Sequence, residues 1–377
     1  MPSSAGPNNV NDSIIFNYDT GDVANSYKGE PTTNLASGLG LIGMSGISLS
    51  YIGLEDGWLK YSMSGTFTGG GYPYTMYLNP VSFTGGQYYS TQAIIKTNVP
   101  YKFNYFGSSG VSYVNEPKNA EGTLTQTTLP DGSSYVTRFG FAYTNTTSQP
   151  GYLFTNPINN TTFNASTDFV YLKNFQVEQK DHCTQYTPSS RSATQGLLDI
   201  SGNGNSIDIT NASFTSNAQM TFDGINDYVD VTTNLGTLNS YTIEHVSYKG
   251  SNDRMPIAFR GGSVFYQYGD NSWYYTHGGV AGEYYYPKSF TINGWGHWTI
   301  TYDGSYVRIY RNGIYEGLQA TSGTASWTSG MRIGYWPYGG GYAWNGQIAV
   351  VKMYSRALGD AEVRQNYLDY KTRFNLQ

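Results

Sequence analysis

The sequence has few charged side chains and one cysteine. Charged residues make up 12% of its 377 positions, whereas about 25% is typical of a soluble protein. Its 21 basic and 26 acidic residues give a net charge of −5, so it lacks the basic excess that binding to a phosphate backbone requires. We therefore expect no nucleic-acid partner. The single Cys183 excludes an intrachain disulfide and a zinc site built from several cysteines.

Motifs for metal binding, secretion and membrane insertion are also missing. The four histidines show neither HxxxH nor HExxH spacing, which argues against a catalytic metal centre. Residues 1–13 contain no basic segment followed by an apolar run, so we expect no Sec signal. The uncharged stretch 31–54 is interrupted by glycine or serine every few residues. This pattern favours a pair of buried strands over a membrane span, and we expect no membrane insertion.

The residues in excess are tyrosine and glycine, with 37 and 46 copies. In the first half of the chain, runs with a period of two, which is typical of strands, recur with no helical segment between them. These runs are residues 58–67, 72–83, 88–97, 101–106, 134–144 and 168–178. Strands at such short spacing predict an antiparallel sandwich or barrel.

Residues 296–317 predict a three-stranded meander. Two alternating runs in this segment end at Asp-Gly (303–304) and at Asn-Gly (312–313). Both dipeptides favour type I′ turns, because these turns need positive φ at both central residues.

The end of the chain predicts one short helix. Val363, Tyr367 and Tyr370 lie at positions i, i+4 and i+7, which is the spacing of one helix face. Asp360 is the expected N-cap, since its side chain can accept a hydrogen bond from the first turn.

The predicted fold class is therefore all-β, with two antiparallel β-sandwich (jelly-roll) domains, a short C-terminal helix and an extended N-terminal arm. Residues 1–35 are polar and turn-rich and are interpreted as the arm. The first sandwich spans 36–180 and the second spans 206–377. Residues 181–205 are rich in Ser, Thr, Gly and Asn without a sustained period, which is typical of a linker.

The second half resembles the laminin-G-like, concanavalin A-like jelly rolls. The resemblance rests on an ordered set of segments: LLDISGNGNSIDI, MTFDGINDYVDV, YTIEHVSY, WGHWTITYDGSYVRIYRNGIYEG and MRIGYWPYGGGYAWNGQIAVVKMYSRALGDAEV. The first half resembles a carbohydrate-binding-module sandwich through VYLKNFQVEQ followed by YTPSSRSA. These resemblances imply two lectin-like sandwiches.

The whole arrangement, with NYDTGDVANSYKGEPTTNL in the arm, resembles virion structural proteins of tailed bacteriophages. This resemblance implies a head decoration, fibre or tail appendage on the virion surface, made in the host cytoplasm without a signal peptide. Its expected partners are capsid or tail proteins and further copies of itself, with a trimer favoured. The expected anchor to the virion is the apolar patch of the arm, Ile14, Ile15, Phe16 and Tyr18.

The jelly-roll resemblance also implies a calcium site. Asp223, Asn226 and Asp227 match its first part and offer the oxygen ligands that calcium prefers. The second part departs from the family pattern, because Ala349 and Val350 stand where many members have Asp-Glu. The alternative is that the three residues shape a turn through bonds to local backbone. No cofactor is required in either case.

Aromatic residues crowd two strands and a loop of the second sandwich. Aromatic rings flanked by Asn and Asp can stack on sugar faces, and they also suit protein interfaces. A glycan platform, a subunit contact and a plain tyrosine-rich surface all remain open. The candidate residues are Tyr266, Tyr268, Trp273, Tyr275, Tyr285, Trp336 and Tyr338.

The sequence offers no catalytic constellation. Retaining glycosidases need two carboxyl groups about 5 to 5.5 Å apart, and the chain has no E-x-D-x-E run and no GxSxG elbow. Glu244 and His245 are adjacent, so on a strand they point to opposite faces and cannot cooperate. We therefore predict a non-enzymatic virion surface protein that is attached by its N-terminal arm and projects two β-sandwich domains. Binding of host or environmental glycans is one of the roles that remain open for these domains. The alternatives are a tail adhesin or secreted lectin and, less favoured, a glycoside hydrolase.

Overall fold

The structure is a computed structural model of the chain. The described backbone comprises residues 9–37, 41–43, 46–68, 76–84, 86–107, 114–117, 127–128, 134–143, 149–214, 220–250, 255–258, 264–267, 273–276, 283–286, 294–336 and 342–377. Within these ranges, side chains are described except at 41–43, 76–83, 100, 103–157, 213–214 and 255–286.

The chain forms two compact units. Unit 1 contains Met1–Pro31 and Ser192–Gln377, and unit 2 contains Thr32–Arg191. The chain therefore begins in unit 1, builds unit 2 and returns to unit 1. Residues 181–205, predicted as a linker, are divided between the two units. Cys183 and Thr184 in this segment are buried.

Unit 2 is built from two larger antiparallel sheets and a short strand pair. The eight-stranded sheet has the order β10 (Thr127–Thr128), β11 (Ser134–Tyr143), β7 (Gln87–Thr97), β14 (Phe169–Glu178), β5 (Trp58–Phe67) and β13 (Thr161–Phe163), with β4 (Ile47–Glu55) paired to β5 and β9 (Val114–Pro117) paired to β11. The four-stranded sheet has the order β3 (Leu41–Gly43), β6 (Met76–Phe83), β12 (Gln149–Pro157) and β8 (Phe103–Gly107). The remaining elements are the pair β2 (Thr32–Thr33) and β15 (Ser190–Arg191) and the 3-10 helix Pro100–Lys102. The six strands predicted in this half are confirmed.

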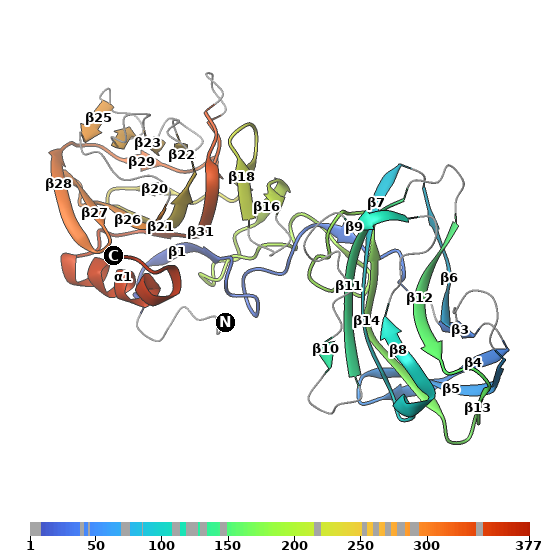
Figure 1. Cartoon of the computed structure of the whole chain (residues 1–377). Coiled ribbons are helices and arrows are strands. Elements are labelled where there is room, and N and C mark those ends of the chain that lie inside the picture. The colour runs from blue at the N-terminus through green and yellow to red at the C-terminus, as the bar shows by residue number, and fades with distance from the viewer. Residues whose placement is uncertain are drawn as a thin grey trace. The chain divides into compact units, whose positions relative to one another are not determined.

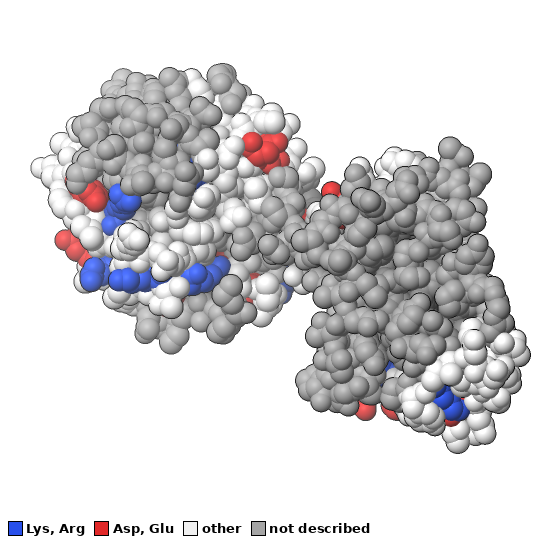
Figure 2. Space-filling view, in the orientation of Figure 1, with Lys and Arg blue, Asp and Glu red and all other residues white. Residues whose placement is uncertain are grey.

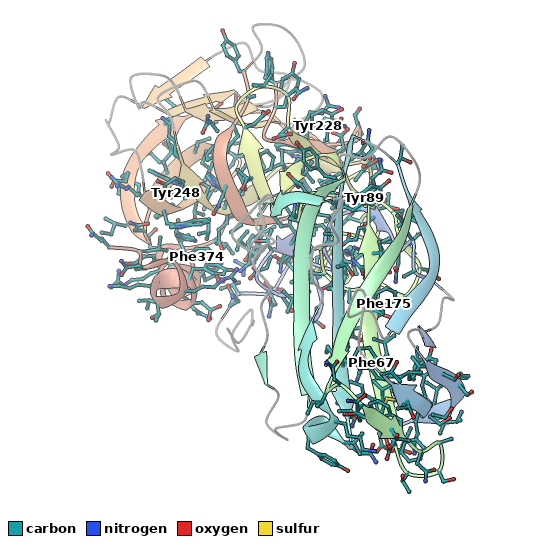
Figure 3. All side chains as sticks on the ribbon, turned by 45° about the vertical axis from the view of Figure 1, so that its right-hand side comes forward. Phe67, Tyr89, Phe175, Tyr228, Tyr248 and Phe374 are labelled. Atoms are coloured by element: carbon teal, nitrogen blue, oxygen red, sulfur yellow. The ribbon has the colours of Figure 1, made fainter. Side chains whose placement is uncertain are left out.

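One face of the larger unit 2 sheet forms a hydrophobic core. Alternate residues of the central strands pack there, including Met63, Ile95 and Leu172, each at most 1% exposed. Phe67 and Phe175 belong to the same cluster and are labelled in Figure 3. The period-two pattern therefore has its expected physical cause, a sheet face that is buried.

Unit 1 is a jelly-roll sandwich with a helix against its larger sheet (Figure 1). The eight-stranded sheet has the order β17 (Ser213–Phe214), β18 (Met220–Asp223), β31 (Asn345–Tyr354), β21 (Tyr241–Lys249), β26 (Gly294–Tyr302), β27 (Tyr306–Arg311) and β28 (Ile314–Ala320), with β1 (Ile14–Asp19) paired to β31. The smaller sheets are β16 (Ile207–Asn211), β19 (Tyr228–Val231) and β30 (Met331–Ile333), then β20 (Thr237–Leu238) with β29 (Ala325–Ser326), and finally β22 (Met255–Ala258), β23 (Val264–Gln267), β24 (Trp273–Thr276) and β25 (Glu283–Tyr286). Strand β21 is buried along nearly its whole length, because the core covers one face and the helix covers the other.

The N-terminal segment is not a separate arm. Strand β1 pairs antiparallel with β31, although the two strands come from opposite ends of the chain (Figure 1). Phe16 and Tyr18 are 0% exposed and belong to the core of unit 1. Ile14 and Ile15 pack against buried clusters of the same unit. The prediction of an apolar virion anchor is contradicted for Phe16 and Tyr18, because their rings are already buried in the core of unit 1. Ile14 and Ile15 are half-buried, and an anchoring role for them stays a prediction.

The predicted meander is confirmed as β26, β27 and β28, adjacent in the sheet. Asn312 and Gly313 both have positive φ, 49° and 71°, as a type I′ turn requires. The turn at 303–304 differs, since only Gly304 has positive φ there. Asp303 Oδ1 instead accepts hydrogen bonds from the backbone N–H groups of Ser305 and Tyr306.

The predicted helix is confirmed as α1 (Asp360–Phe374). Val363, Tyr367 and Tyr370 are buried against the larger sheet, as their spacing predicted. The N-cap is Gly359 rather than Asp360. The carboxylate of Glu362 accepts a 2.9 Å bond from the Gly359 backbone N–H, which satisfies one exposed donor at the start of the helix.

Candidate binding surface

The outer face of the three-stranded sheet in unit 1 carries a cluster of aromatic and charged side chains. On β19, Val229 and Val231 point into the core, so Tyr228 and Asp230 lie on the opposite face, where both are half-buried. Arg332 is the neighbour of Asp230 in the register of β19 and β30. We call the cluster of Tyr228, Asp230, Arg332, Tyr335 and Trp336 the Tyr228 face.

Arg332 is held rigidly within this face. Its Nε and Nη2 atoms each donate a 2.8 Å hydrogen bond to the Asp230 carboxylate. Its guanidinium carbon lies 3.8 Å from the centre of the Tyr228 ring. The bond to Asp230 raises the pKa of Arg332 above its already high ordinary value, so the side chain stays charged. Bidentate pairing and stacking together fix the planar group.

The aromatic part of the face continues beyond Tyr228, which Figure 3 labels in unit 1. The rings of Tyr228 and Tyr335 are stacked, with centres 5.8 Å apart and planes at 28°. Trp336 follows Tyr335 and is half-buried. Its backbone N–H donates a 2.9 Å bond to the carbonyl of Tyr342. The predicted candidate Trp336 therefore lies in the chain beside a stacked tyrosine pair.

The other predicted aromatic candidates are only partly described. Tyr266, Trp273, Tyr275 and Tyr285 lie on β23, β24 and β25. The register aligns Tyr266 with Tyr274 and Tyr274 with Tyr285, in one row across three strands. The edge strand β22 of this sheet contacts β30. The sheet that carries this row therefore adjoins β30, the strand of Arg332. Tyr268 and Tyr338 lie outside the described residues.

Sequence reasoning missed Tyr228, Asp230, Arg332 and Tyr335. The alternation in YVDV is a signal that would place Tyr228 and Asp230 on one face of a strand. Arg332 comes about a hundred residues later, however, and its partner follows only from the pairing of β19 with β30. A local pattern cannot reveal such a contact.

The predicted calcium residues form a hydrogen-bonded turn. Asp223 Oδ1 accepts bonds of 2.7 and 3.4 Å from the backbone N–H groups of Ile225 and Asn226. Asp227 Oδ2 accepts a 2.8 Å bond from the Asp223 N–H. In the part of the chain that the structure describes, no three His, Cys, Asp or Glu side chains are grouped to hold a metal ion. These contacts favour the turn alternative, and calcium at this position remains a prediction.

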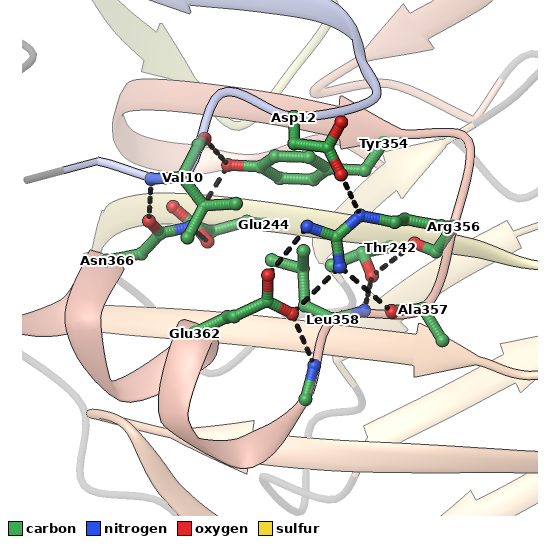
Figure 4. Close-up of polar contacts among 11 residues, drawn as sticks. Val10, Asp12, Thr242, Glu244, Tyr354, Arg356, Ala357, Leu358, Glu362 and Asn366 are labelled. Carbon is green, nitrogen blue, oxygen red and sulfur yellow. Dashed lines mark hydrogen bonds and ion pairs between the residues drawn. The ribbon is translucent and has the colours of Figure 1, made fainter.

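Glu244, the carboxylate considered for hydrolysis, is completely buried beneath helix α1. Its Oε1 atom lies 3.6 Å from Lys352 Nζ and 3.5 Å from His297 Nε2. Its Oε2 atom accepts a 2.7 Å bond from Asn366, whose own carbonyl oxygen accepts a bond from the Val10 N–H (Figure 4). This carboxylate joins the helix, the sheet and the N-terminal segment, which is a structural role.

The adjacent His245 faces the opposite side of the sheet, as the strand geometry predicted. Its ring meets the core residue Trp344 edge to face, with centres 6.2 Å apart. Burial, together with the charge of His297, lowers the pKa of His245 to about 3. Burial alone would raise the pKa of Glu244, but the positive charges of Lys352 and His297 outweigh it and lower that pKa to about 2. Glu244 and His245 therefore do not share one site.

Residues 223–364 match the family described as the concanavalin A-like lectin/glucanases superfamily. This match supports the jelly-roll fold of unit 1. The sequence matches none of the curated proteins with which it was compared. Among the described residues, no helix has the length and apolar character needed to cross a membrane.

Several solved structures share low identity with the chain. The botulinum neurotoxin serotype D ligand-binding domain, in complex with N-acetylneuraminic acid, is 13% identical with a TM-score of 0.38, and the match covers 47% of this chain and 49% of that one. A heptameric SAP-like pentraxin from Limulus polyphemus is 16% identical with a TM-score of 0.32, covering 42% and 79%. A Trypanosoma rangeli sialidase mutant with trans-sialidase activity is 14% identical with a TM-score of 0.37, covering 48% and 31%. The chain spans about half the length of the toxin domains that it matches.

Proposed function

We propose that the protein is a non-enzymatic binding protein of a tailed-bacteriophage virion, and that unit 1 binds a glycan through the Tyr228 face. The glycan proposal rests on the arrangement of Arg332, whose guanidinium group stacks on the Tyr228 ring and pairs with the Asp230 carboxylate. Sugar rings present apolar faces that stack on aromatic side chains, and a few fixed polar groups then orient the hydroxyls. The match to a lectin-containing superfamily is consistent with this use.

The burial of Glu244 supports the non-enzymatic part of the proposal. A catalytic carboxylate must reach the glycosidic bond. Glu244 is 0% exposed and is engaged by Lys352 and Asn366. The carboxylate singled out from the sequence is therefore not placed to act on a substrate.

The virion part of the proposal rests on the order of segments along the chain and on surface composition. In the view of Figure 2 most of the described surface is uncharged, with Lys, Arg, Asp and Glu confined to small patches. Uncharged polar surface with tyrosine suits close packing beside neighbouring subunits. Capsid or tail proteins and further copies of this chain, with a trimer favoured, are the proposed partners on the virion surface.

A glycan array with the full chain tests the binding proposal. We expect Tyr335→Ala to weaken binding about tenfold, since it removes a stacked ring. Tyr315→Ala is the matched control, because Tyr315 lies on β28 and is 49% exposed. Equal binding by the wild type and Tyr335→Ala would contradict a role for the Tyr228 face. Retained melting temperature in both variants would show that folding is preserved.

Mass spectrometry of purified virions tests the proposal that the protein belongs to a virion. A copy number similar to that of the major capsid protein would indicate a head decoration, and a copy number similar to that of the tail fibres would indicate a tail appendage. Absence of the chain from purified particles would contradict the virion proposal and leave the glycan proposal standing for a secreted lectin.

A further inference from the structure

Unit 2 contains a pocket of about 640 Å³, which falls within the range of about 300–1,000 Å³ typical of small-ligand sites. It opens where strands β4, β5 and β14 meet two segments of chain, residues 34–37 and 186–188. No candidate residue from the sequence lies in this unit. The pocket therefore needs its own explanation.

The pocket has aromatic walls with accessible rings. Tyr61 and Phe175 are buried, at 3% and 7% exposure, and form part of the core. Tyr51 and Tyr186 also line the pocket but are 54% and 40% exposed. The centres of the Tyr51 and Tyr61 rings lie 5.4 Å apart. Exposed rings above a packed aromatic base suit a ligand with flat apolar faces.

Polar groups accompany these rings. Asn174, Ser37 and Lys173 line the pocket. The amide of Asn34, another lining residue, is already engaged, since it donates to the carbonyls of Phe175 and Thr187. Asn34 therefore shapes the wall, whereas Lys173 brings a positive charge to the pocket. A purely apolar ligand would leave that charge without a partner.

Lys173 also connects the pocket to a row of cations and aromatic rings on the sheet. Lys173 Nζ lies 5.7 Å from the centre of the Trp58 ring, and Lys96 Nζ lies 4.5 Å from the same centre. Tyr171 is the register partner of both Lys60 and Lys96. Lys173, which lines the pocket, therefore shares the Trp58 ring with Lys96.

Charge at this surface favours an anionic ligand. Lys60 is paired with Glu55 through a 2.6 Å contact. Within the described ranges, Lys96 and Lys173 form no ion pair with a carboxylate; each rests near the Trp58 ring. Glu55 itself would repel a dense polyphosphate, and the whole chain carries a net charge of −5. A ligand with spaced negative charges and apolar faces fits better than a nucleic acid.

We propose that this pocket and the adjoining lysines bind an acidic oligosaccharide. A sugar ring stacks on Tyr51 and Tyr186 inside the pocket, and its carboxylate pairs with Lys173. A second carboxylate further along the chain of sugars pairs with Lys96. This site is separate from the Tyr228 face of unit 1.

The test is an array in which each uronate- or sialate-containing oligosaccharide is printed beside its carboxyl-reduced counterpart, with the full chain as the probe. We expect binding to acidic members and not to reduced ones. Lys173→Gln and Tyr186→Ala should each weaken that binding about tenfold. Two control variants should leave the binding of acidic oligosaccharides unchanged. Lys28→Gln makes the same charge change in unit 1. Tyr101→Ala removes a 70% exposed tyrosine of unit 2 that lies outside the pocket.

Several results would overturn the inference. The protein could bind no acidic oligosaccharide, or it could bind the carboxyl-reduced counterparts equally well. Lys173→Gln and Lys28→Gln could also lose the same amount of binding affinity. Competition by inorganic polyphosphate as strong as that by the bound oligosaccharide would reduce the site to a general anion surface. Loss of acidic binding in Tyr335→Ala but not in Lys173→Gln would move the activity to unit 1, so failure of this site and failure of the Tyr228 face are distinguishable.

Discussion

Arg373, in the last turn of helix α1, donates hydrogen bonds of 2.6 and 2.7 Å to the carboxylate of Asp19 on the first strand. These residues are 354 positions apart in the sequence. Asp19 is 1% exposed, so its charge needs this partner. Both ends of the described chain are thereby held within unit 1, and the N-terminal segment is part of the fold.

Deletion of residues 2–30 should prevent unit 1 from folding. The deletion removes strand β1 and with it the buried rings of Phe16 and Tyr18. Loss of two fully buried aromatic side chains costs several kcal/mol, on the order of 3–5 each, which is comparable to the whole stability of a domain. Limited proteolysis and near-UV circular dichroism would detect the change. Val23→Ala, at a 54% exposed position of the same segment, should be harmless, and a truncated protein with native near-UV signal would contradict the prediction.

Asp19→Asn should destabilise the protein by about 2–3 kcal/mol, because it leaves the guanidinium of Arg373 beside a neutral group in a largely buried position. Denaturant unfolding would measure the difference in free energy. Asp303→Asn is the matched control, since the Asp303–Arg308 pair is 31% and 33% exposed and such pairs contribute at most about 1 kcal/mol. If both variants lose the same free energy of unfolding, the burial of Asp19 does not strengthen its ion pair with Arg373.

Glu244→Gln should cost about 3 kcal/mol, since the buried ammonium of Lys352 would lose its carboxylate partner. The double variant Glu244→Gln/Lys352→Met should recover part of this loss, because an apolar group replaces the unpaired cation. Thermal unfolding of the two single variants and the double variant would complete a mutant cycle. If the double variant loses the sum of the single losses, the pair is not coupled.

Stability should fall in two overlapping stages as the pH decreases. The pKa of His245 is about 3 in the folded state against an ordinary value of 6.5, so the unfolded chain takes up the extra proton and stability is lost from pH 6.5 down to about 3. The pKa of Glu244 is about 2 against 4.5, so its contribution is present above pH 4.5 and is lost between pH 4.5 and about 2. Melting temperatures across this range would measure the slope. His245→Gln should flatten the slope between pH 6.5 and 4.5, and an unchanged slope would contradict the assignment.

Removal of calcium with EDTA should leave the melting temperature of unit 1 unchanged. Asp223 and Asp227 already accept backbone hydrogen bonds within their turn, so the turn does not need a metal ion to hold its shape. Differential scanning calorimetry with EDTA and with added calcium would compare the two states. A rise in melting temperature on addition of calcium, lost in Asp223→Asn, would instead establish the metal site.

The sequence by itself determined the local elements. Period-two runs predicted the strands, because a sheet with one buried face requires that alternation. The Asn-Gly pair at 312–313 predicted a turn with positive φ at both residues, and the spacing of Val363, Tyr367 and Tyr370 predicted the buried face of the helix. Each of these features depends on residues that are close together in the chain.

Tertiary structure alone decided the partners of distant segments. The polar N-terminal segment has the composition of a free arm, yet β1 completes the sheet at β31 because its apolar residues find a core there. The Tyr228 face depends on Arg332 meeting Tyr228 across two strands, and the unit 2 pocket combines residues 34–37 with 186–188. Such contacts follow from the register and packing of whole sheets, which short-range patterns do not encode.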